Sequence, residues 1–349
     1  MNNIERFGVF LPSYIWEGDG PERARGIREF AQTVEDLGFD SLFVTDHLLA
    51  AKRFYSVSFL EPLAALAVVA GATNRVRLGT SILIMPLRHP VMLAKELATM
   101  QFLSENRVIL GAGVGWNEFE YAALGVKKSD RGKRTDEMLD IIIPLLEGET
   151  VTYRGNFYSV DDLFIEPRAS QRPEIWIGGG SQLADPKSPD LPKFAESVKA
   201  RVLRTDGWIP RPTCPVDEIA NDWRQLQEYY VEHGRDPSEC VVSHENFMHI
   251  VLTNDPAEAR RQQHEAFLRV MSNERGPRYL ETVYLFGTPT EIVDSLQRRI
   301  DAGVGYFMLH TMTPDPRQLQ DWIDEIIANV KFPADAGPIR RVTPAPVAA

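Results

Sequence analysis

The sequence has few cysteines and no long hydrophobic run, and each shortage excludes a class of protein. Cys214 and Cys240 are too few and too far apart for a disulfide framework or a CxxC metal site. The longest apolar stretch, residues 63–72, is well short of the ~18 residues that a membrane span needs. The first residues show no signal-peptide core followed by a small-residue cleavage site. We therefore expect a cytoplasmic protein that does not enter a membrane.

Basic side chains are also in the minority. The 349 residues include 38 Lys and Arg against 49 Asp and Glu, which gives a formal net charge of −11. Nucleic-acid-binding proteins normally present a basic surface, so nucleic acid is not an expected partner. Hydrophobic residues make up 44% of the chain and charged residues 25%, which is the balance of a folded globular protein and excludes wholesale disorder.

Short apolar runs alternate with longer segments of helical periodicity along the chain. The expected strands are residues 7–11, 41–45, 76–84, 108–113, 174–178, 207–210, 241–252 and 306–310. The expected helices are residues 21–37, 59–72, 90–104, 134–146, 191–204, 216–233, 256–271, 290–302 and 316–330. Eight strands, nearly all followed by a helix, predict a parallel sheet closed into a (β/α)8 TIM barrel.

Two segments interrupt this alternation within a single predicted domain, residues 1–335. Residues 151–167 read as a short hairpin that turns at Arg154-Gly155-Asn156, and residues 271–284 as a polar, irregular insertion or mobile lid. The Pro/Ala-rich residues 336–349 are expected to form a flexible tail. The helix at 59–72 is apolar around most of its circumference, which fits either a subunit interface in a homodimer or higher homo-oligomer, or close packing under a neighbouring helix.

Active sites of such barrels lie at the C-terminal ends of the strands, so those positions are the candidates. Asp46 and His47 follow the second strand and could accept a hydrogen bond and exchange a proton near neutral pH, although capping of a loop or helix is equally compatible. Small residues end the third strand, where a planar ligand could approach closely. His89, further on, is expected to have a structural role.

Two glycine-rich segments follow later strands. Residues 111–117 approach a dinucleotide fingerprint, but Trp116 stands where its third glycine belongs and three strand–helix units precede it. This segment could lie beside a ring system, with Trp116 as an aromatic wall. Gly178-Gly179-Gly180-Ser181 could form an anion-binding nest for a phosphate, with Arg131 and Arg134 as possible partners.

Other chemistries find no support in the sequence. His244 and His249 resemble a HExxH zinc motif with one residue too many, and in a strand two residues five apart point to opposite faces. No GxSxG nucleophile motif occurs, and we expect no metal site. A phosphate-binding lyase or isomerase would need a lysine or a carboxylate dyad at the strand ends, and no lysine stands there.

Taken together, these strand ends resemble the luciferase-like monooxygenase family, whose members use reduced FMN or the deazaflavin F420. The resemblance covers most of the chain, with its motifs in order. They are FGVFLP at 7–12, GFDSLFVTDH at 38–47, LGTS at 78–81 through HP at 89–90, residues 104–110 with GAGVGWNEFEYAALG, IGGGS at 177–181, and FGTP at 286–289 with AGV at 302–304.

The resemblance implies a barrel that binds flavin at its C-terminal mouth. It places a non-proline cis peptide at Ser81–Ile82 and Asp46 near the flavin ring, and it assigns catalysis to His47. Val114 stands where luciferase itself has a flavin-contacting arginine, which argues against a light-emitting enzyme. The cofactor-binding residues that we infer are Asp46, Ser81, Ile82, Gly113, Arg131, Gly178, Gly179, Gly180 and Ser181. The residues expected to line the substrate cavity are Trp16, Phe54, Tyr55, Trp116 and Trp208.

The function implied is that of a monooxygenase that uses reduced FMN and O2 to oxygenate a small organic substrate through a flavin (hydro)peroxide. The chain has no NAD(P)H motif, so a separate flavin reductase is expected to supply the reduced FMN. Two alternatives remain open. One is an F420-dependent dehydrogenase or reductase on the same fold, and the other is a flavin-binding protein without turnover.

Overall fold

A computed structural model describes residues 3–14, 20–50, 55–181, 194–272, 276–334 and 336–339. Within these ranges one parallel sheet contains β1 (Phe7–Phe10), β2 (Ser41–Val44), β3 (Arg77–Thr80), β4 (Leu83–Ile84), β5 (Val108–Gly113), β8 (Glu174–Gly178), β9 (Gly207–Ile209), β10 (Val241–Met248) and β11 (Tyr306–Thr311). The strands follow the order β3-β2-β1-β11-β10-β9-β8-β5-β4, and β3 also pairs with β5. That last pairing closes the sheet into a (β/α)8 barrel, as predicted.

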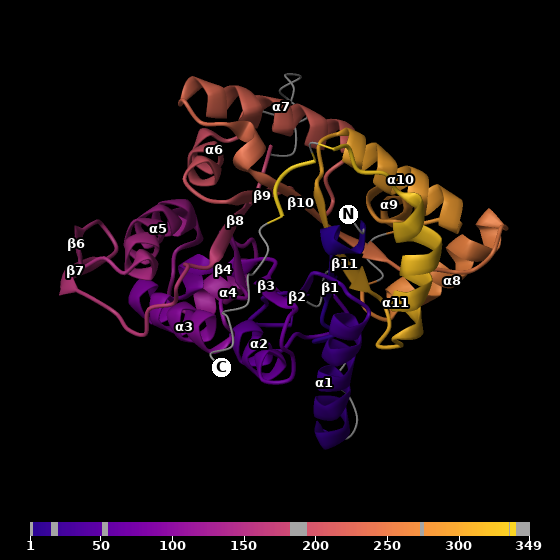
Figure 1. Cartoon of the computed structure of the whole chain (residues 1–349), viewed down its shortest axis with the longest axis horizontal. Helices are drawn as coiled ribbons and strands as arrows, with labels where there is room; N and C mark the ends of the chain where they lie inside the picture. The colour runs from indigo at the N-terminus through magenta and orange to yellow at the C-terminus, as the bar shows by residue number, and fades with distance from the viewer. Residues whose placement is uncertain are drawn as a thin grey trace, which may run out of the picture.

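Helices surround the barrel in chain order (Figure 1). They are α1 (Gly20–Asp36), α2 (Pro62–Ala70), α3 (Pro90–Leu103), α5 (Arg131–Glu147), α6 (Glu196–Leu203), α7 (Val216–Glu232), α10 (Pro289–Asp301) and α11 (Arg317–Asp321). A π-helical turn, Trp322–Ile326, and a 3-10 turn, Ile327–Asn329, continue the last of them. No helix in the described ranges is both long and apolar enough to cross a membrane.

Side chains alternate between the inside of the barrel and the layer of helices because successive residues of a strand point to opposite faces. Eight of the inward-facing residues form one cluster: Phe10, Phe43, Ile109, Trp176, Ile209, Val241, Tyr306 and Met308. The outward-facing residues join the helices in the main hydrophobic core. Both faces of each barrel strand are thus covered, which is why the strands read as nearly continuous apolar runs in the sequence.

Four further helical or irregular regions lie outside this regular alternation. The third predicted strand is interrupted at Ser81–Ile82, which separates β3 from β4. A short helix that we did not predict, α4 (Glu118–Ala123), follows β5, and α8 (Pro256–Leu268) follows β10. The prediction of an irregular chain at 271–284 is wrong for residues 277–283, which form helix α9 (Pro277–Val283).

Helix α9 forms because two apolar side chains three residues apart, Leu280 and Val283, are buried in a second hydrophobic cluster. This cluster also contains Tyr14 and Phe247, so it connects the inserted helices to the mouth of the barrel. The mobility that we predicted for this segment stays a prediction.

The predicted hairpin is present as β6 (Val151–Arg154) and β7 (Ser159–Leu163), which pair antiparallel. Its turn is held by Glu137 of α5, whose carboxylate accepts hydrogen bonds from the backbone N–H groups of Asn156 (2.7 Å), Phe157 (2.9 Å) and Tyr158 (3.1 Å). Burial alone would raise the pKa of Glu137, but these three donors outweigh it and the pKa is lowered.

A lowered pKa makes the contribution of Glu137 to stability depend on pH. We expect Glu137→Gln to reduce the free energy of unfolding at pH 7 by about 1.5–3 kcal/mol, because hydrogen bonds to a charged acceptor are lost. The native carboxylate stabilises fully above its unfolded pKa of about 4.3 and loses this effect as pH falls through its lower folded pKa. Urea unfolding of both proteins from about pH 7 to about pH 3 should therefore show the difference shrinking with acidity. A difference that does not change with pH would contradict this account.

The first residues of the predicted tail, 336–339, lie against the start of the chain. The Arg6 guanidinium donates to the carbonyl oxygens of Ala336 (2.8 Å) and Gly337 (3.2 Å), and also to Gly305 (2.9 Å). Ala336 and Gly337 are thus hydrogen-bonded beside the N-terminal end of β1, and the flexibility of the predicted tail stays a prediction. Residues 340–349 lie outside the described part of the chain.

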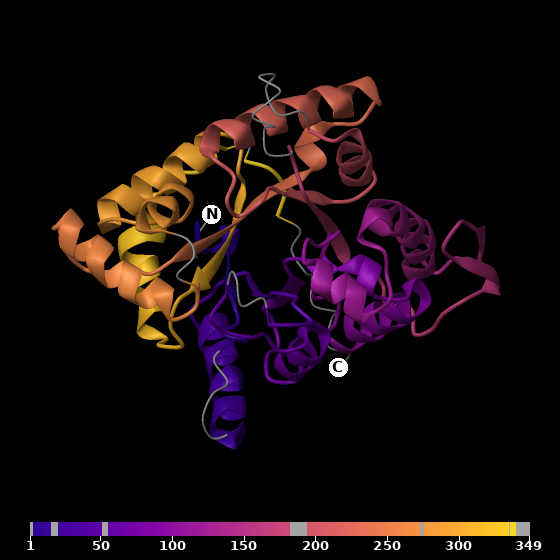
Figure 2. The same ribbon diagram turned by 180° about the vertical axis from the view of Figure 1, so that it is seen from behind.

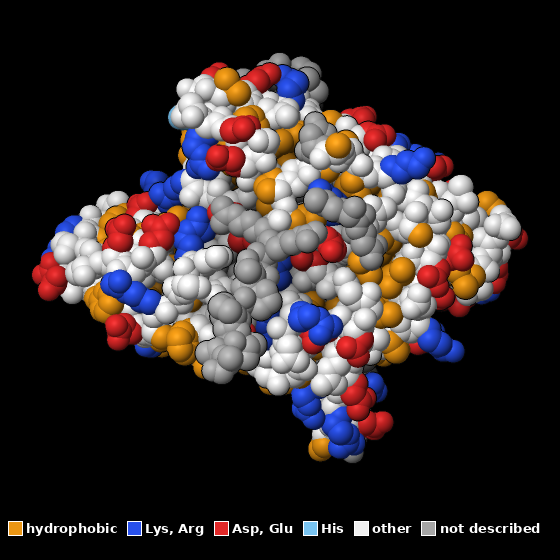
Figure 3. All heavy atoms as spheres, viewed as in Figure 1, with side chains coloured by type: hydrophobic (Ala, Val, Ile, Leu, Met, Phe, Trp, Pro, Cys, Tyr) orange, Lys and Arg blue, Asp and Glu red, His pale blue; other side chains and the backbone are white. Residues whose placement is uncertain are grey.

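Two surface features stand out beyond the barrel. The N-terminal half of α1 projects from the body in both views (Figures 1 and 2), and Figure 3 shows charged side chains gathered on it. On α2 and α3, four apolar side chains remain at least 48% exposed: Val68, Met92, Phe102 and Leu103. The predicted helix at 59–72 therefore packs one face against the core and leaves part of another uncovered.

Candidate active site

The interruption between β3 and β4 is a tightly packed cradle. The peptide bond between Ser81 and Ile82 is cis, as the resemblance implied. The Ile82 side chain lies against two glycines. A Cβ atom would stand 2.5 Å from Ile82 Cδ1 at Gly113 and 2.8 Å from Ile82 Cγ2 at Gly178. The structure thus brings together four residues that we predicted to bind the cofactor, and a side chain at either glycine position would collide with Ile82.

Asp46 lies directly behind this bulge. Its Oδ2 atom accepts hydrogen bonds from the backbone N–H of Ile84 (2.8 Å) and from the Arg88 guanidinium (2.6 Å). Burial alone would lower the pKa of Arg88, but Asp46 and Glu61 raise it, so the guanidinium stays charged. Asp46 therefore fixes the backbone that follows the cis bond, and its predicted contact with a ring stays a prediction.

His47 lies in a small, largely enclosed site. Its Nδ1 atom is 3.3 Å from Glu120 Oε1, which also accepts the backbone N–H of Leu49 (3.2 Å). The imidazole is surrounded by three aromatic rings, Tyr55, Phe59 and Trp116, with ring centroids 5.4–5.6 Å away. His47 is 8% exposed and Glu120 is fully buried, so the pair is shielded from bulk water.

We did not predict a role for Glu120 from the sequence, although the residues around it carry the pattern of a helix start. The Asn117 side chain caps α4 by accepting the backbone N–H of Phe119 (3.2 Å), and a carboxylate three residues after an N-cap is a common helix start. That spacing predicts α4, but it does not predict that the carboxylate turns toward His47.

The glycine-rich loop after β8 differs from the nest that we predicted. The backbone N–H of Ser181 donates to Asp222 Oδ2 (2.7 Å), and the Ser181 hydroxyl donates to Asp222 Oδ1. The backbone N–H of Gly179 donates to the Ile209 carbonyl oxygen (3.0 Å). These donors hold the loop against α7 and β9, and the predicted contact of Ser181 with a phosphate stays a prediction. Burial raises the pKa of Asp222.

Trp208 is another correction. Its neighbours on β9, Gly207 and Ile209, face the barrel interior, so Trp208 points outward beneath the helices and is fully buried. Its indole N–H donates to the Gly179 carbonyl oxygen (2.7 Å), which supports the glycine loop from behind. The prediction that Trp208 lines the substrate cavity is therefore wrong. The strand is covered on both faces, so its sequence lacks the alternation of polar and apolar residues that would show which way Trp208 points.

The remaining predicted site residues are placed as follows. Tyr55 and Trp116 lie beside His47, and Trp116 is 44% exposed. Arg131 begins α5, where it donates to the Lys128 carbonyl oxygen (2.9 Å). Burial raises the pKa of Tyr121 to about 12, and the charge of Arg131 opposes this effect. Trp16 and Phe54 fall outside the described residues.

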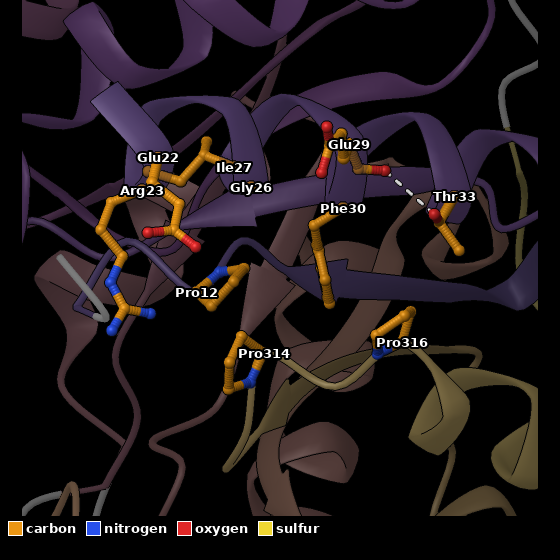
Figure 4. A pocket seen from close by; sticks show the side chains of 10 residues that line it. All are labelled: Pro12, Glu22, Arg23, Gly26, Ile27, Glu29, Phe30, Thr33, Pro314 and Pro316. Carbon is orange, nitrogen blue, oxygen red and sulfur yellow. Dashed lines mark hydrogen bonds between the residues drawn. The ribbon is translucent and has the colours of Figure 1, made fainter. Parts of the chain in front are cut away.

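Glu245 also matters at the mouth, although we did not predict it. This residue of β10 accepts a hydrogen bond from the Ser81 hydroxyl (2.6 Å) and contacts His310 of β11 (2.9 Å), which we expected in the pocket wall. By contrast, a pocket between α1 and the loops after β1 and β11 contains none of the predicted residues (Figure 4). Pro12, Phe30 and Pro314 line it, outside the barrel mouth.

Comparison with known proteins agrees with this geometry. The family model for luciferase-like monooxygenases matches residues 5–306. An F420-dependent glucose-6-phosphate dehydrogenase of Microbacterium testaceum is 28% identical over 339 residues, covering 93% of this chain and 97% of the relative. A 4-hydroxyprotoasukamycin monooxygenase of Streptomyces nodosus subsp. asukaensis is 31% identical over 232 residues, covering 66% and 60%.

The fold is likewise shared with a solved structure. A monooxygenase from Streptomyces bottropensis superposes with a TM-score of 0.75 at 20% identity, covering 93% of this chain and 99% of that one. The family model spans most of the chain, including β1, the bulge, the His47 site and the glycine loop. This chain belongs to the luciferase-like monooxygenase family, and it is an oxidoreductase of that family.

Proposed function

We propose that this protein is a monooxygenase that binds reduced FMN at the Ser81–Ile82 bulge and oxygenates a small apolar substrate with O2. The observation that carries the proposal is the cis bulge at Ser81–Ile82, packed against Gly113 and Gly178, together with the enclosed His47 site. Bound reduced FMN would supply the electrons that activate O2. The cradle residues would position the ring, and the aromatic side chains would exclude water from it.

His47 is the proton carrier in this proposal. In this proposal the Glu120 carboxylate accepts a hydrogen bond from His47, which places the imidazole proton on Nδ1. Nε2 is then the atom that can exchange a proton with a reacting group. Glu120 acts as the positioning residue that fixes this tautomer.

The substrate class follows from the rings around His47. Tyr55, Phe59 and Trp116 offer apolar surface, and the nearby Arg88 is already engaged by Asp46 and Glu61. A sugar phosphate, which the name of one relative specifies, would need cationic partners to offset its charge. We therefore propose an uncharged, apolar or aromatic molecule. We further propose a separate flavin reductase as partner, and a homodimer that covers the exposed face of α2 and α3.

Dependence on F420 is the second candidate, because the F420-dependent relative matches almost its whole length. Anaerobic titration of the apoprotein with reduced FMN and with reduced F420, followed by absorbance, tests both. Binding of FMN and O2-dependent product formation are expected. Binding of F420 alone, with hydride transfer and no O2 consumption, would replace the proposal. Binding of FMN without any turnover would indicate a non-catalytic protein, and binding of neither would refute it.

A glycine substitution tests the location of the cofactor. We expect Gly113→Val to weaken cofactor binding at least about 100-fold, because the new side chain must displace Ile82 from the cradle. Gly276→Val is the matched control, since a Cβ there meets no atom within 4 Å. Titration of both variants by absorbance, with circular dichroism to confirm folding, gives the comparison. Unchanged affinity in a folded Gly113→Val protein would place the ring elsewhere.

A further inference from the structure

A buried carboxylate lies directly beneath the bulge. Glu245 Oε2 accepts the Ser81 hydroxyl at 2.6 Å, and Glu245 Oε1 lies 2.9 Å from His310 Nε2. The three residues come from the β3–β4 bulge, β10 and β11, and they are 2%, 7% and 2% exposed. They form one continuous chain of polar contacts across the inside of the barrel mouth.

The surroundings of this chain are apolar. The His310 ring is stacked between Phe10 (centroids 3.4 Å apart) and Phe247 (3.9 Å), with interplanar angles of 14° and 8°. Burial lowers the pKa of His310, and the opposing effect of Glu245 does not restore it. His310 is therefore neutral at pH 7 and donates to Glu245 through Nε2–H.

Glu245 thus accepts hydrogen bonds from two uncharged groups, the Ser81 hydroxyl and the His310 imidazole, and no Lys or Arg of the described residues forms an ion pair with it. The neighbouring titratable side chains do not change this. Tyr14 donates its hydroxyl to the Thr311 carbonyl oxygen, and burial raises its pKa. Tyr284 packs edge-on against Phe247. His244, on the same strand, points to the opposite face, and its burial lowers its pKa to about 3.

We propose that Glu245 positions Ser81 at the cofactor-binding bulge, and that the Glu245–His310 pair takes up one proton from solvent when a reduced cofactor binds there. This rests on the proposed function. Reduced flavin and deazaflavin rings carry negative charge near neutral pH. A second negative charge brought close to a buried carboxylate favours its protonated form. Binding is therefore coupled to proton uptake and becomes tighter as pH falls.

The test measures binding rather than turnover. Anaerobic titrations with reduced FMN and reduced F420, in weakly buffered solution with a pH indicator, report both affinity and protons taken up. For whichever cofactor binds the wild type, we expect uptake approaching one proton and affinity falling by up to about tenfold per pH unit between about pH 6 and pH 8. Binding of oxidised FMN, whose ring is neutral, should cause the protein to take up fewer protons.

Glu245→Gln keeps the shape of the side chain and removes its charge. We expect this variant to lose the proton uptake and the pH dependence of affinity. Ser81→Ala removes the hydrogen bond between the bulge and Glu245, so it should weaken cofactor binding. The affinity lost in the double variant should not exceed the sum of the losses in the two single variants. Glu174→Gln is the control, because Glu174 is a similarly buried carboxylate at the base of the barrel, paired with Arg77. This control should retain proton uptake and affinity.

The outcomes separate this inference from the proposed function. If the wild type binds a reduced cofactor and Glu245→Gln keeps the same uptake and pH dependence, the inference is overturned and the proposed function stands. If Glu174→Gln loses them equally, the effect is a general consequence of weakening the barrel and the inference is again overturned. If the wild type binds neither cofactor, the proposed function fails and the inference fails with it.

Discussion

His47→Ala should lower the turnover number by about 100-fold to 10,000-fold, the range typical of a lost general acid or base. His47 sits within a few ångströms of Tyr55, Phe59 and Trp116, so an alanine leaves the cavity open but its walls in place. We therefore expect cofactor affinity to change far less than turnover. Steady-state O2 consumption and product formation, with the coupling ratio between them, provide the measurement.

The matched control for this variant is His89→Ala. His89 precedes α3 and contacts the Tyr158 ring, away from the His47 site, and it makes no capping hydrogen bond. We expect it to retain wild-type turnover. Glu120→Gln should give an intermediate loss together with an altered pH profile, because the amide can present either an oxygen or an N–H group to Nδ1. Full coupled turnover in a folded His47→Ala protein would exclude His47 from catalysis.

The barrel itself could be predicted because its strands carry a strong signal. Residues 108–113 and 174–178 were predicted with the bounds that the structure has, since each is a compact apolar run that ends in glycine. The third strand was predicted as one segment because apolar residues resume at Ile82 and continue to Ile84. The separation of β3 from β4 depends on a peptide geometry that composition does not report, and only the family resemblance pointed to it.

Side-chain direction was the main limit on predicting the site. All eight residues of β10 are buried, so its sequence does not reveal that Glu245 faces the mouth while His244 faces the helices. The same ambiguity led to the wrong assignment of Trp208. In strands with one exposed face, alternation of polar and apolar residues fixes the register, but strands covered on both faces lack that contrast.

The contacts of Ser181 could not be predicted for a different reason. Its partner, Asp222, comes from α7, 41 residues later in the chain. A glycine-rich segment followed by serine matches a phosphate nest equally well whether its donors face a ligand or an internal carboxylate. Only the packing of α7 against β8 and β9 decides between the two, and packing between distant elements leaves no local trace in the sequence.

Arg77→Met should cause the largest loss of stability of any substitution proposed here, about 3–5 kcal/mol, as found when one partner of a buried ion pair is removed. Arg77 lies at the base of the barrel, where its guanidinium donates to Asp40 (2.6 and 3.0 Å) and to Glu174 (2.9 Å). Burial alone would lower the pKa of Arg77, but the two carboxylates raise it. Methionine would leave the two largely enclosed carboxylates close together without a cation.

Urea unfolding tests this expectation, with Arg224→Met as the matched control. Arg224 pairs with Glu228 at 2.8 Å on the surface of α7, where both side chains are more than half exposed. A solvated pair of this kind contributes at most about 0.5 kcal/mol. Adding Asp40→Asn and Glu174→Gln to Arg77→Met should recover part of the loss, because the unpaired charges are then removed. If Arg77→Met unfolds no more easily than Arg224→Met, water must reach the base of the barrel and screen both carboxylates.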